Sequence, residues 1–386
     1  MEKAERRVKI GISGSYGGMN LGDEAILEGM LSQLRATLPA DVTVFSRVAS
    51  STRVEHEVER VVPVRTLTRR EIAPEVRALD LLVLGGGGIL YDGDAEIYLR
   101  EVSLAQEMGI PVLLYAISAG PLTASGSRRA VREALNASPP PVITVRDRLG
   151  YRLLEDVGVT QEIQLTADPA FLLEPEELSL EALRAEGVDL DRHLIGFSVR
   201  EPGPAAPHID PEEYYTLLAN AADFVIERYD AEVVFVPMEK SDVQHSHGVV
   251  AHMQNAERAE ILRRRYSPRQ ILDLMGRFDF AVGMRLHFLI FAALRGTPFA
   301  ALPYASKVSG LLDDMGMDSP PLGSIGIGQL IATIDRSWDT RADIRARIGE
   351  RLPALKSRAK RTNDLLLDVL RRPGEQLAGG TAPVSH

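Results

Sequence analysis

The chain has 386 residues, a formal net charge of −10, and 45% hydrophobic and 25% charged residues. This composition is typical of a packed globular protein, and the length exceeds that of a single hydrophobic core, so we expect two domains. The acidic balance disfavours nucleic acid as a partner. The chain contains no cysteine, which excludes disulfides, thiolate metal sites and a cysteine nucleophile.

The apolar segments of the sequence predict neither export nor insertion into a membrane. Met1–Ser13 carries mixed charge and enters a strand-length apolar run, without the apolar core and cleavage site of a secretory signal. The most apolar stretch, Phe278–Tyr304, is interrupted by Arg285, His287 and Arg295, and no run approaches the roughly 18 residues of a spanning helix. We expect a cytoplasmic protein, with association at the inner face of the membrane left open.

Short runs rich in Val, Ile and Leu alternate with amphipathic stretches, a pattern that predicts parallel sheets covered by helices on both faces. The strands predicted in the first half are Val8–Ser13, Val42–Val48, Leu79–Leu84, Pro111–Ile117, Val142–Val145 and Ile163–Thr166. A helix is predicted between the first two, over Asp23–Leu38, because its apolar residues recur at helical spacing.

An acidic segment, Leu173–Asp191, separates this half from a second set of elements. There the predicted strands are Leu194–Val199, Glu232–Val236, Phe280–Gly283 and Phe299–Leu302, and the predicted helices are Glu212–Tyr229 and Pro268–Arg277. The fold class predicted is therefore α/β with two Rossmann-like doubly wound domains. We place them at residues 1–175 and 176–339, followed by a helical region and tail at 340–386.

The first candidate for chemistry is the glycine-rich turn between the first strand and the first helix. Gly14, Gly17 and Gly18 would let a ligand approach the backbone, and free N–H groups at the start of the helix suit an anion or a sugar hydroxyl. The spacing is not G-x-G-x-x-G, and no acidic residue ends the second strand at Phe45, which disfavours a dinucleotide. Asp23 is either the helix N-cap or a substrate contact.

A second glycine run, Gly85–Gly88, follows the strand that ends at Leu84. Four consecutive glycines cost chain entropy, so they indicate a tight turn or a backbone that touches a ligand. Gly86 and Gly87 are the candidates for substrate contact. A crowded strand end without ligand remains an equal alternative.

The third candidate is Arg146, which closes one strand just before Asp147 opens a helix. This places the arginine at the carboxyl edge of a sheet, where ligands bind in open α/β folds. Its planar fork of donors suits a phosphate or carboxylate.

The fourth candidate is chemically the most informative. Arg285 and His287 follow the strand that ends at Gly283, within a predominantly apolar run in which a buried cation needs a partner. Lys307, after the next strand, either faces the same ligand or lies on the surface. We predict no metal site, because no carboxylate at a ligand-like position supports His245, His247 and His252, which are expected in a polar connection.

Taken in order, these segments resemble the polysaccharide pyruvyl transferase family. The resemblance rests on GSYGGMNLGDEAIL near the start, the GGGG strand end, VRD at 145–147, ADPAF at 167–171 and GMRLHFLIFAALRGTPFAALPYASKV late in the chain. It implies a GT-B-like arrangement of the two domains, no metal or cofactor, and phosphoenolpyruvate as co-substrate. The reaction implied is transfer of the pyruvyl group to two hydroxyls of a sugar in a cell-surface glycan precursor, as a pyruvate ketal.

The resemblance also assigns roles. The family's anion-binding arginines fall on Arg146 and Arg285 and its histidine on His287, which agrees with the choice made from the residues. The acceptor, a sugar or a lipid-linked oligosaccharide, is expected from the amino-terminal side, near Asn20 and Asp23. As a hypothesis, the two arginines clamp the donor, His287 is the general acid or base, and Asp23 orients or deprotonates the acceptor.

Two other functions fit the same architecture, since fold alone does not choose the chemistry. A nucleotide-sugar glycosyltransferase would need a ribose site, and no acidic pair at a suitable spacing follows Lys307. A non-catalytic glycan-binding protein would not need Arg285 and His287. The sequence leaves open whether the chain forms homo-oligomers.

Overall fold

A computed structural model describes residues 6–201, 210–302, 306–317 and 326–371. The described residues divide into two compact units. The first comprises Met1–Gly18, Ile26–Leu172 and Ser357–His386, and the second comprises Met19–Ala25 and Leu173–Lys356. Two short segments, Met19–Ala25 and Ser357–His386, thus belong to a unit whose main part lies elsewhere in the sequence. The predicted domains, 1–175 and 176–339, are consecutive ranges and do not include this exchange.

The first unit contains a parallel sheet in the strand order β3-β2-β1-β4-β6-β7-β8, with β5 also paired to β6. Its strands are β1 (Val8–Ser13), β2 (Ala40–Ser46), β3 (Arg60–Pro63), β4 (Leu81–Leu84), β5 (Gly87–Leu90), β6 (Val112–Ala119), β7 (Val142–Val145) and β8 (Ile163–Leu165). The winding direction reverses between β1 and β4, so the carboxyl ends of these two strands form the switch point of the sheet.

Alternate residues of this sheet face two separate cores. On β4, Leu82 and Leu84 pack into one core while Leu81 and Val83 pack into the other, as the two-residue period of a strand requires. The helices of this unit are α1 (Leu21–Thr37), α2 (Ala49–Glu55), α3 (Arg69–Arg77), α4 (Ala95–Glu107), α5 (Ser125–Leu135), α6 (Arg148–Val157) and the short turn η1 (Pro169–Leu172).

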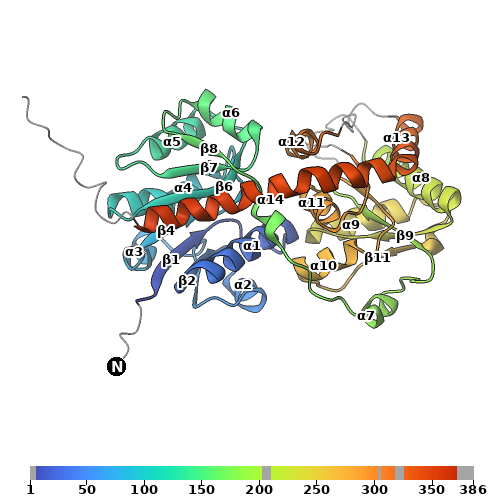
Figure 1. Cartoon of the computed structure of the whole chain (residues 1–386), viewed down its shortest axis with the longest axis horizontal. Helices are drawn as coiled ribbons and strands as arrows, with labels where there is room; N and C mark the ends of the chain where they lie inside the picture. The colour runs from blue at the N-terminus through green and yellow to red at the C-terminus, as the bar shows by residue number, and fades with distance from the viewer. Residues whose placement is uncertain (1–5, 202–209, 303–305, 318–325, 372–386) are drawn as a thin grey trace, which may run out of the picture. The chain divides into compact units, whose positions relative to one another are not determined.

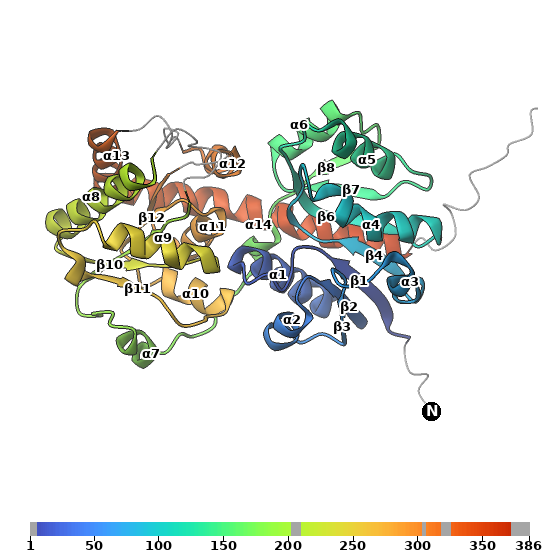
Figure 2. The same cartoon turned by 180° about the vertical axis from the view of Figure 1, so that it is seen from behind.

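The two faces of the sheet are covered by different helices. Buried residues of α3, α4, α5 and α6 line one core, and those of α1 and of the end of α14 (Arg341–Arg371) line the other. Figure 1 shows the red end of α14 lying across the sheet on the face of α1, and Figure 2 shows α3 and α4 on the opposite face. The strands are thus buried on both sides, which explains their continuous apolar sequences.

The second unit repeats this architecture with a parallel sheet in the order β11-β10-β9-β12-β13. Its strands are β9 (His193–Ser198), β10 (Ala231–Phe235), β11 (Ala259–Ile261), β12 (Phe280–Gly283) and β13 (Phe299–Ala301). Its helices are α7 (Leu180–Ala185), α8 (Pro211–Tyr229), α9 (Lys240–Val250), η2 (Ala256–Arg258), α10 (Pro268–Met275), α11 (Leu286–Arg295), α12 (Ser306–Met315) and α13 (Ile327–Asp339). The switch point here lies between β9 and β12.

The predicted fold class is confirmed, since both units are doubly wound α/β. Each predicted strand is present, with ends shifted by at most a few residues, but β3, β5 and β11 were not predicted. The expectation that His245 and His247 lie in a polar connection is wrong, because they lie on α9. The tail predicted at the end of the region 340–386 falls outside the described residues, which end at Arg371.

Among the described helices, none combines the length and the apolar character needed to cross a bilayer. The longest, α14, has 31 residues, and its sequence carries charges along most of its length.

Candidate functional site

The start of α1 is fixed by Asn20. Its side-chain Oδ1 accepts hydrogen bonds from the backbone N–H groups of Gly22, at 2.9 Å, and Asp23, at 3.3 Å. This satisfies two of the donors that a helix N-terminus leaves without a partner. The interpretation of Asp23 as N-cap is therefore wrong; Asp23 lies half-buried in the first turn.

Asn20 also joins this turn to the second sheet of the chain. Asn20 and Glu239 form an isolated antiparallel bridge, and the N–H of Leu21 donates to the carbonyl of Met238 at 2.8 Å. The Asn20 amide Nδ2 donates to the Glu239 carboxylate at 3.3 Å. These contacts explain why Met19–Ala25 belongs to the second unit.

Arg285 follows β12 and is almost fully buried, with 8% of its surface exposed. Its Nε donates to Asp242 Oδ2 at 3.0 Å, its Nη2 donates to Asp242 Oδ1, and Nη2 also lies 3.0 Å from Glu239 Oε2. A cation at this depth needs charge compensation, and the paired geometry with Asp242 supplies it. The Glu239 carboxylate is thus shared between Arg285 and Asn20.

Asp242 is completely buried in the first turn of α9. Besides Arg285, its Oδ2 accepts the N–H groups of Met238, at 3.1 Å, and Glu239, at 3.2 Å. Burial raises the pKa of Asp242, while the bonds and charge of Arg285 act in the opposite direction. Asp242 therefore fixes both the guanidinium and the turn that carries Glu239.

His287 lies in the first turn of α11, and its ring packs against α1 at Gly22. A Cβ atom on Gly22 would overlap the imidazole, with Nδ1 as its nearest atom. Only glycine permits this approach. The structure thus brings Asn20, Asp23, Arg285 and His287 into one unit, although the sequence separates the first pair from the second.

Arg200 is a further cation that the sequence reasoning missed. It lies two residues beyond β9, the neighbour of β12, so Arg200 and Arg285 both follow strands that flank the switch point. Glu201 contacts Arg200, and its Oε2 lies 3.8 Å from Arg285 Nη2. The signal was available, since an arginine just after a strand is the observation used for Arg146.

Lys307 lies in the first turn of α12, half-buried, in the same unit as Arg285. Its predicted contact with substrate stays a prediction.

Arg146 belongs to the other unit, at the end of β7. It is buried, and its Nη1 donates to Asp168 Oδ2 at 2.6 Å, with Asp147 Oδ2 at 3.6 Å from its Nε. Asp147 caps α6 by accepting the N–H of Gly150 at 2.6 Å. Asp168, within the ADPAF segment, is thus the counter-ion of Arg146. Anion binding by Arg146 stays a prediction.

The three glycines predicted to contact substrate all have reasons within the chain to be glycine. Gly17 has φ +78°, and a Cβ there would come within 2.6 Å of both Ser46 Oγ and the carbonyl of Val48. Gly87 has φ +100°. At Gly86 a Cβ would lie 3.0 Å from Ile26 and 3.1 Å from the carbonyl of Tyr115. Local packing therefore accounts for them, and their contact with substrate stays a prediction.

Comparison with known proteins places this geometry in a family. Residues 20–306 match the family described as polysaccharide pyruvyl transferase. The chain belongs to the polysaccharide pyruvyl transferase family. It is 20% identical over 319 residues to the amylovoran biosynthesis protein AmsJ of Erwinia amylovora, with 79% of this chain and 76% of that protein covered.

Solved structures similar to this pyruvyl transferase family member show its fold. A UDP-GlcNAc 2-epimerase from Neisseria meningitidis matches with a TM-score of 0.59 and 11% identity, covering 93% of this chain and 99% of that one. A glycosyltransferase from Rickettsia africae matches with a TM-score of 0.62 and 10% identity, covering 95% and 100%. These neighbours are GT-B-like, which confirms the predicted fold class and, at such identities, nothing about chemistry.

Two of the three histidines considered for metal binding contact other side chains of the protein. The Tyr215 hydroxyl and His245 Nδ1 lie 2.8 Å apart, and His252 Nε2 lies 2.8 Å from a Glu212 carboxylate oxygen. Burial lowers the pKa of His245. These contacts give both side chains a structural role in this family member.

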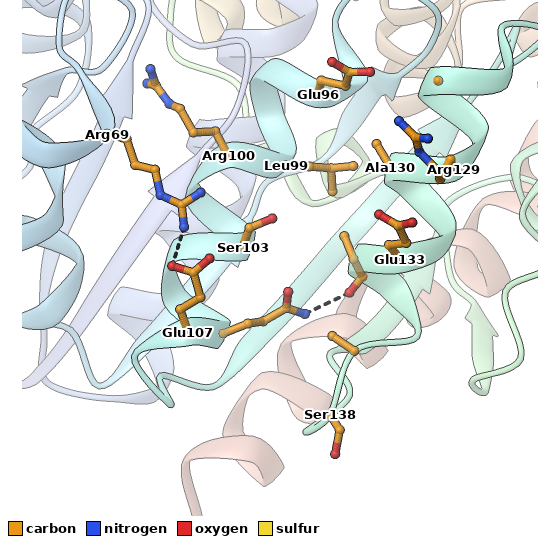
Figure 3. Close-up of a pocket in the computed structure, with 14 residues that line it drawn as sticks. Arg69, Glu96, Leu99, Arg100, Ser103, Glu107, Arg129, Ala130, Glu133 and Ser138 are labelled. Carbon is orange, nitrogen blue, oxygen red and sulfur yellow. Dashed lines mark hydrogen bonds and ion pairs between the residues drawn. The ribbon is translucent and has the colours of Figure 1, made fainter.

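A groove of about 650 Å³ lies on the outer helical layer of the first unit, between α4 and α5 (Figure 3). Three arginines and three glutamates are among the residues that line it, including the ion pair of Arg69 with Glu107. Gln106 and Ala134, which also line it, are joined by a hydrogen bond from the Gln106 amide to the Ala134 carbonyl at 2.8 Å. None of the predicted site residues lines this groove, so we assign it no part in pyruvyl transfer.

Proposed function

We propose that this member of the pyruvyl transferase family transfers the pyruvyl unit of phosphoenolpyruvate to two hydroxyls of one sugar and releases phosphate. The observation that carries the proposal is the grouping of Arg285, His287 and the first turn of α1 in one unit, beside the switch point between β9 and β12. Ligands of open α/β sheets bind at such points. Membership of the family supports the reaction class.

The donor carries a phosphate and a carboxylate, and preorganised cations best stabilise such charges. Arg285 is held rigidly by Asp242, which suits a group that must point at a fixed place. Arg200, beyond the adjacent strand, is the second cation that we propose for the donor, while Arg146, in the first unit, keeps the anion-binding role predicted from the sequence.

In the proposed reaction, C3 of phosphoenolpyruvate gains a proton and C2 becomes oxocarbenium-like. One sugar hydroxyl forms a bond to C2 and loses its proton. The second hydroxyl then forms its own bond to C2 and loses its proton as the C2–O bond to phosphate breaks and phosphate leaves with the bonding electron pair. His287 is the proposed general acid or base, since an imidazole titrates near neutrality. Asp23, in the turn that faces His287, is the proposed orienting group for the acceptor.

The reaction is tested by measuring phosphate release from phosphoenolpyruvate with a panel of monosaccharide and lipid-linked oligosaccharide acceptors. We expect release that depends on acceptor and enzyme, with a mass increase of the acceptor that corresponds to one pyruvate ketal. Absence of release with every acceptor would contradict the proposal. A thermal-shift titration with phosphoenolpyruvate and with UDP- and GDP-sugars tests the rival glycosyltransferase function, because a specific ligand raises apparent stability.

Binding measurements on single variants test the role of each of the three arginines. Arg200→Met and Arg285→Lys should each weaken phosphoenolpyruvate binding, because each changes a charge-assisted contact. Arg146→Met tests the contribution of the first unit in the same titration. If the Arg200 and Arg285 variants bind phosphoenolpyruvate with unchanged affinity, the donor does not bind at the switch point of the second unit.

A further inference from the structure

The two arginines that follow β9 and β12 share a carboxylate of the protein itself. Glu201 Oε1 contacts Arg200 Nη2, and Glu201 Oε2 lies 3.8 Å from Arg285 Nη2. All three residues belong to the second unit. Each oxygen of the carboxylate thus pairs with a different guanidinium, so the space between the two cations accommodates one carboxylate group.

Both arginines are also fixed by contacts other than Glu201. The Arg200 carbonyl accepts a hydrogen bond from the buried Tyr214 hydroxyl at 2.6 Å. Asp242 accepts hydrogen bonds from the Arg285 guanidinium through both of its carboxylate oxygens. We therefore expect the two cations to keep their positions when the Glu201 side chain moves away.

An anionic donor that reaches Arg285 meets carboxylates that already contact this arginine. Asp242, Glu239 and Glu201 all form ion pairs with its Nη2. Like charges at such short distances repel an incoming anion. Withdrawal of one of these carboxylates therefore favours binding of the donor.

Of the three carboxylates, Glu201 has the fewest contacts to lose. Asp242 is completely buried and accepts the N–H groups of Met238 and Glu239. Glu239 accepts the Asn20 amide at 3.3 Å, and its backbone pairs with that of Asn20. The Glu201 side chain is 37% exposed, and within the part of the chain that the structure describes its carboxylate contacts only the two arginines. Its withdrawal breaks these contacts alone and returns the carboxylate to water.

We propose that Glu201 occupies the place of the donor carboxylate in the free protein, and that the carboxylate of phosphoenolpyruvate displaces it from between Arg200 and Arg285. The inference rests on the proposed function in that the donor is phosphoenolpyruvate. The incoming carboxylate has the same planar pair of oxygens as the group that it replaces, so both charge-assisted contacts form again. No covalent bond changes in this step.

Displacement of Glu201 also determines which anions bind well. Every anion that enters must first break the contacts of Glu201 with the two arginines. An ion that engages a single guanidinium does not recover that cost, whereas a carboxylate that spans both of them does. Glu201 thus favours the donor over small inorganic anions.

The proposal is tested with the full chain by isothermal titration calorimetry at fixed ionic strength, using phosphoenolpyruvate, pyruvate and inorganic phosphate as separate ligands. Glu201→Gln keeps the size of the side chain and removes the competing charge. It should bind phosphoenolpyruvate and pyruvate about fivefold more tightly than the wild type, the effect of removing one partly exposed ion pair. Glu176→Gln is the matched control, because Glu176 lies 3.9 Å from Arg269 in the same unit, and its affinities should equal those of the wild type.

A second variant separates displacement from the long-range effect of a negative charge. Glu201→Asp keeps the charge but shortens the side chain by one methylene group, so its carboxylate spans the two guanidiniums poorly. It should bind phosphoenolpyruvate more tightly than the wild type and less tightly than Glu201→Gln. Wild-type affinity in Glu201→Asp would leave only the effect of the charge and would overturn displacement.

The remaining outcomes are also decisive. Equal or weaker binding of phosphoenolpyruvate by Glu201→Gln overturns the proposal, since Glu201 would then support the arginines rather than compete for them. Tighter binding of inorganic phosphate without tighter binding of pyruvate overturns the assignment to a carboxylate, and so does the absence of binding by all three ligands. If pyruvate binds more tightly to the variant while phosphoenolpyruvate binds neither protein, displacement holds and the proposed donor is refuted.

Discussion

Both units have a parallel sheet, but the side chains that follow the carboxyl ends of the strands differ between them. Each has a buried carboxylate beneath it, Glu101 on α4 in the first unit and Asp242 on α9 in the second. Burial raises the pKa of both. Glu101 accepts the hydroxyl of Ser13 at the end of β1, at 3.0 Å, whereas Asp242 holds the guanidinium of Arg285 beyond β12.

This difference separates what each edge offers a ligand. Beyond β9 and β12 the second unit concentrates arginines fixed by carboxylates, an arrangement suited to an anionic donor. Beyond β1, β2 and β5 the first unit instead carries hydroxyl-bearing side chains, Ser15 and Tyr91, and the exposed Arg47. The same fold thus carries different side chains at the carboxyl ends of its strands, and the fold alone does not choose the ligand.

The largest effect should come from removing Asp242. In Asp242→Ala the buried Arg285 loses its paired counter-ion, and breaking a buried ion pair in this way costs about 3–5 kcal/mol. Chemical denaturation measures the loss. The matched variant, Asp156→Ala, removes an exposed carboxylate 2.9 Å from Arg128 and should cost far less. Equal losses of unfolding free energy in the two variants would show that the buried pair of Asp242 and Arg285 contributes no more to stability than an exposed ion pair.

The next effect concerns turnover. His287→Ala should lower kcat by about 10²-fold or more, the usual contribution of an acid–base group, while phosphoenolpyruvate binding persists. His247→Ala, on the exposed side of α9, is the control. Wild-type turnover in His287→Ala would remove this histidine from the mechanism.

A smaller effect should follow from the contact between α1 and His287. Gly22→Ala places a methyl group where the imidazole lies, so the ring must move, and we expect kcat to fall about tenfold. Gly349→Ala, on α14, adds a methyl group into open space and should leave kcat unchanged. If Gly22→Ala retains full turnover, the position of the imidazole against α1 does not matter for catalysis.

The sequence predicted the framework well because parallel strands buried on both faces are continuous runs of Val, Ile and Leu. It missed β5, which reads GGIL, because glycine is rare in strands, and β11, which has three residues. It missed α9 because KSDVQHSHGVV combines weak helix formers with no apolar face.

Of the candidate site, the sequence analysis found Arg285 and His287 but neither Arg200 nor the carboxylates that pair with Arg285. Arg285 and His287 were noticeable as polar residues in an apolar run, whereas Asp242 and Glu239 lie in a polar stretch where carboxylates are ordinary. Their pairing depends on how β10 and β12 flank β9, a fact of topology that no local pattern records. The arginine after β9 could have been found by the rule that selected Arg146.

The smallest effect tests the buried carboxylate of the first unit. Glu101 lies between Ser13 Oγ and Arg100 Nε, at 3.0 and 2.8 Å, and burial raises its pKa above the ordinary glutamate value. Between the unfolded pKa, about 4.3, and the raised folded pKa, the folded state binds more protons than the unfolded state. The free energy of unfolding contributed by Glu101 should therefore decrease as the pH rises through that window.

Denaturation of the wild type and Glu101→Gln from pH 4 upward should show the wild type losing stability relative to the variant, which does not titrate at this position. A difference that stays constant with pH would show that Ser13 and Arg100 offset burial, and the two buried carboxylates would then differ in ionisation as well as in partner.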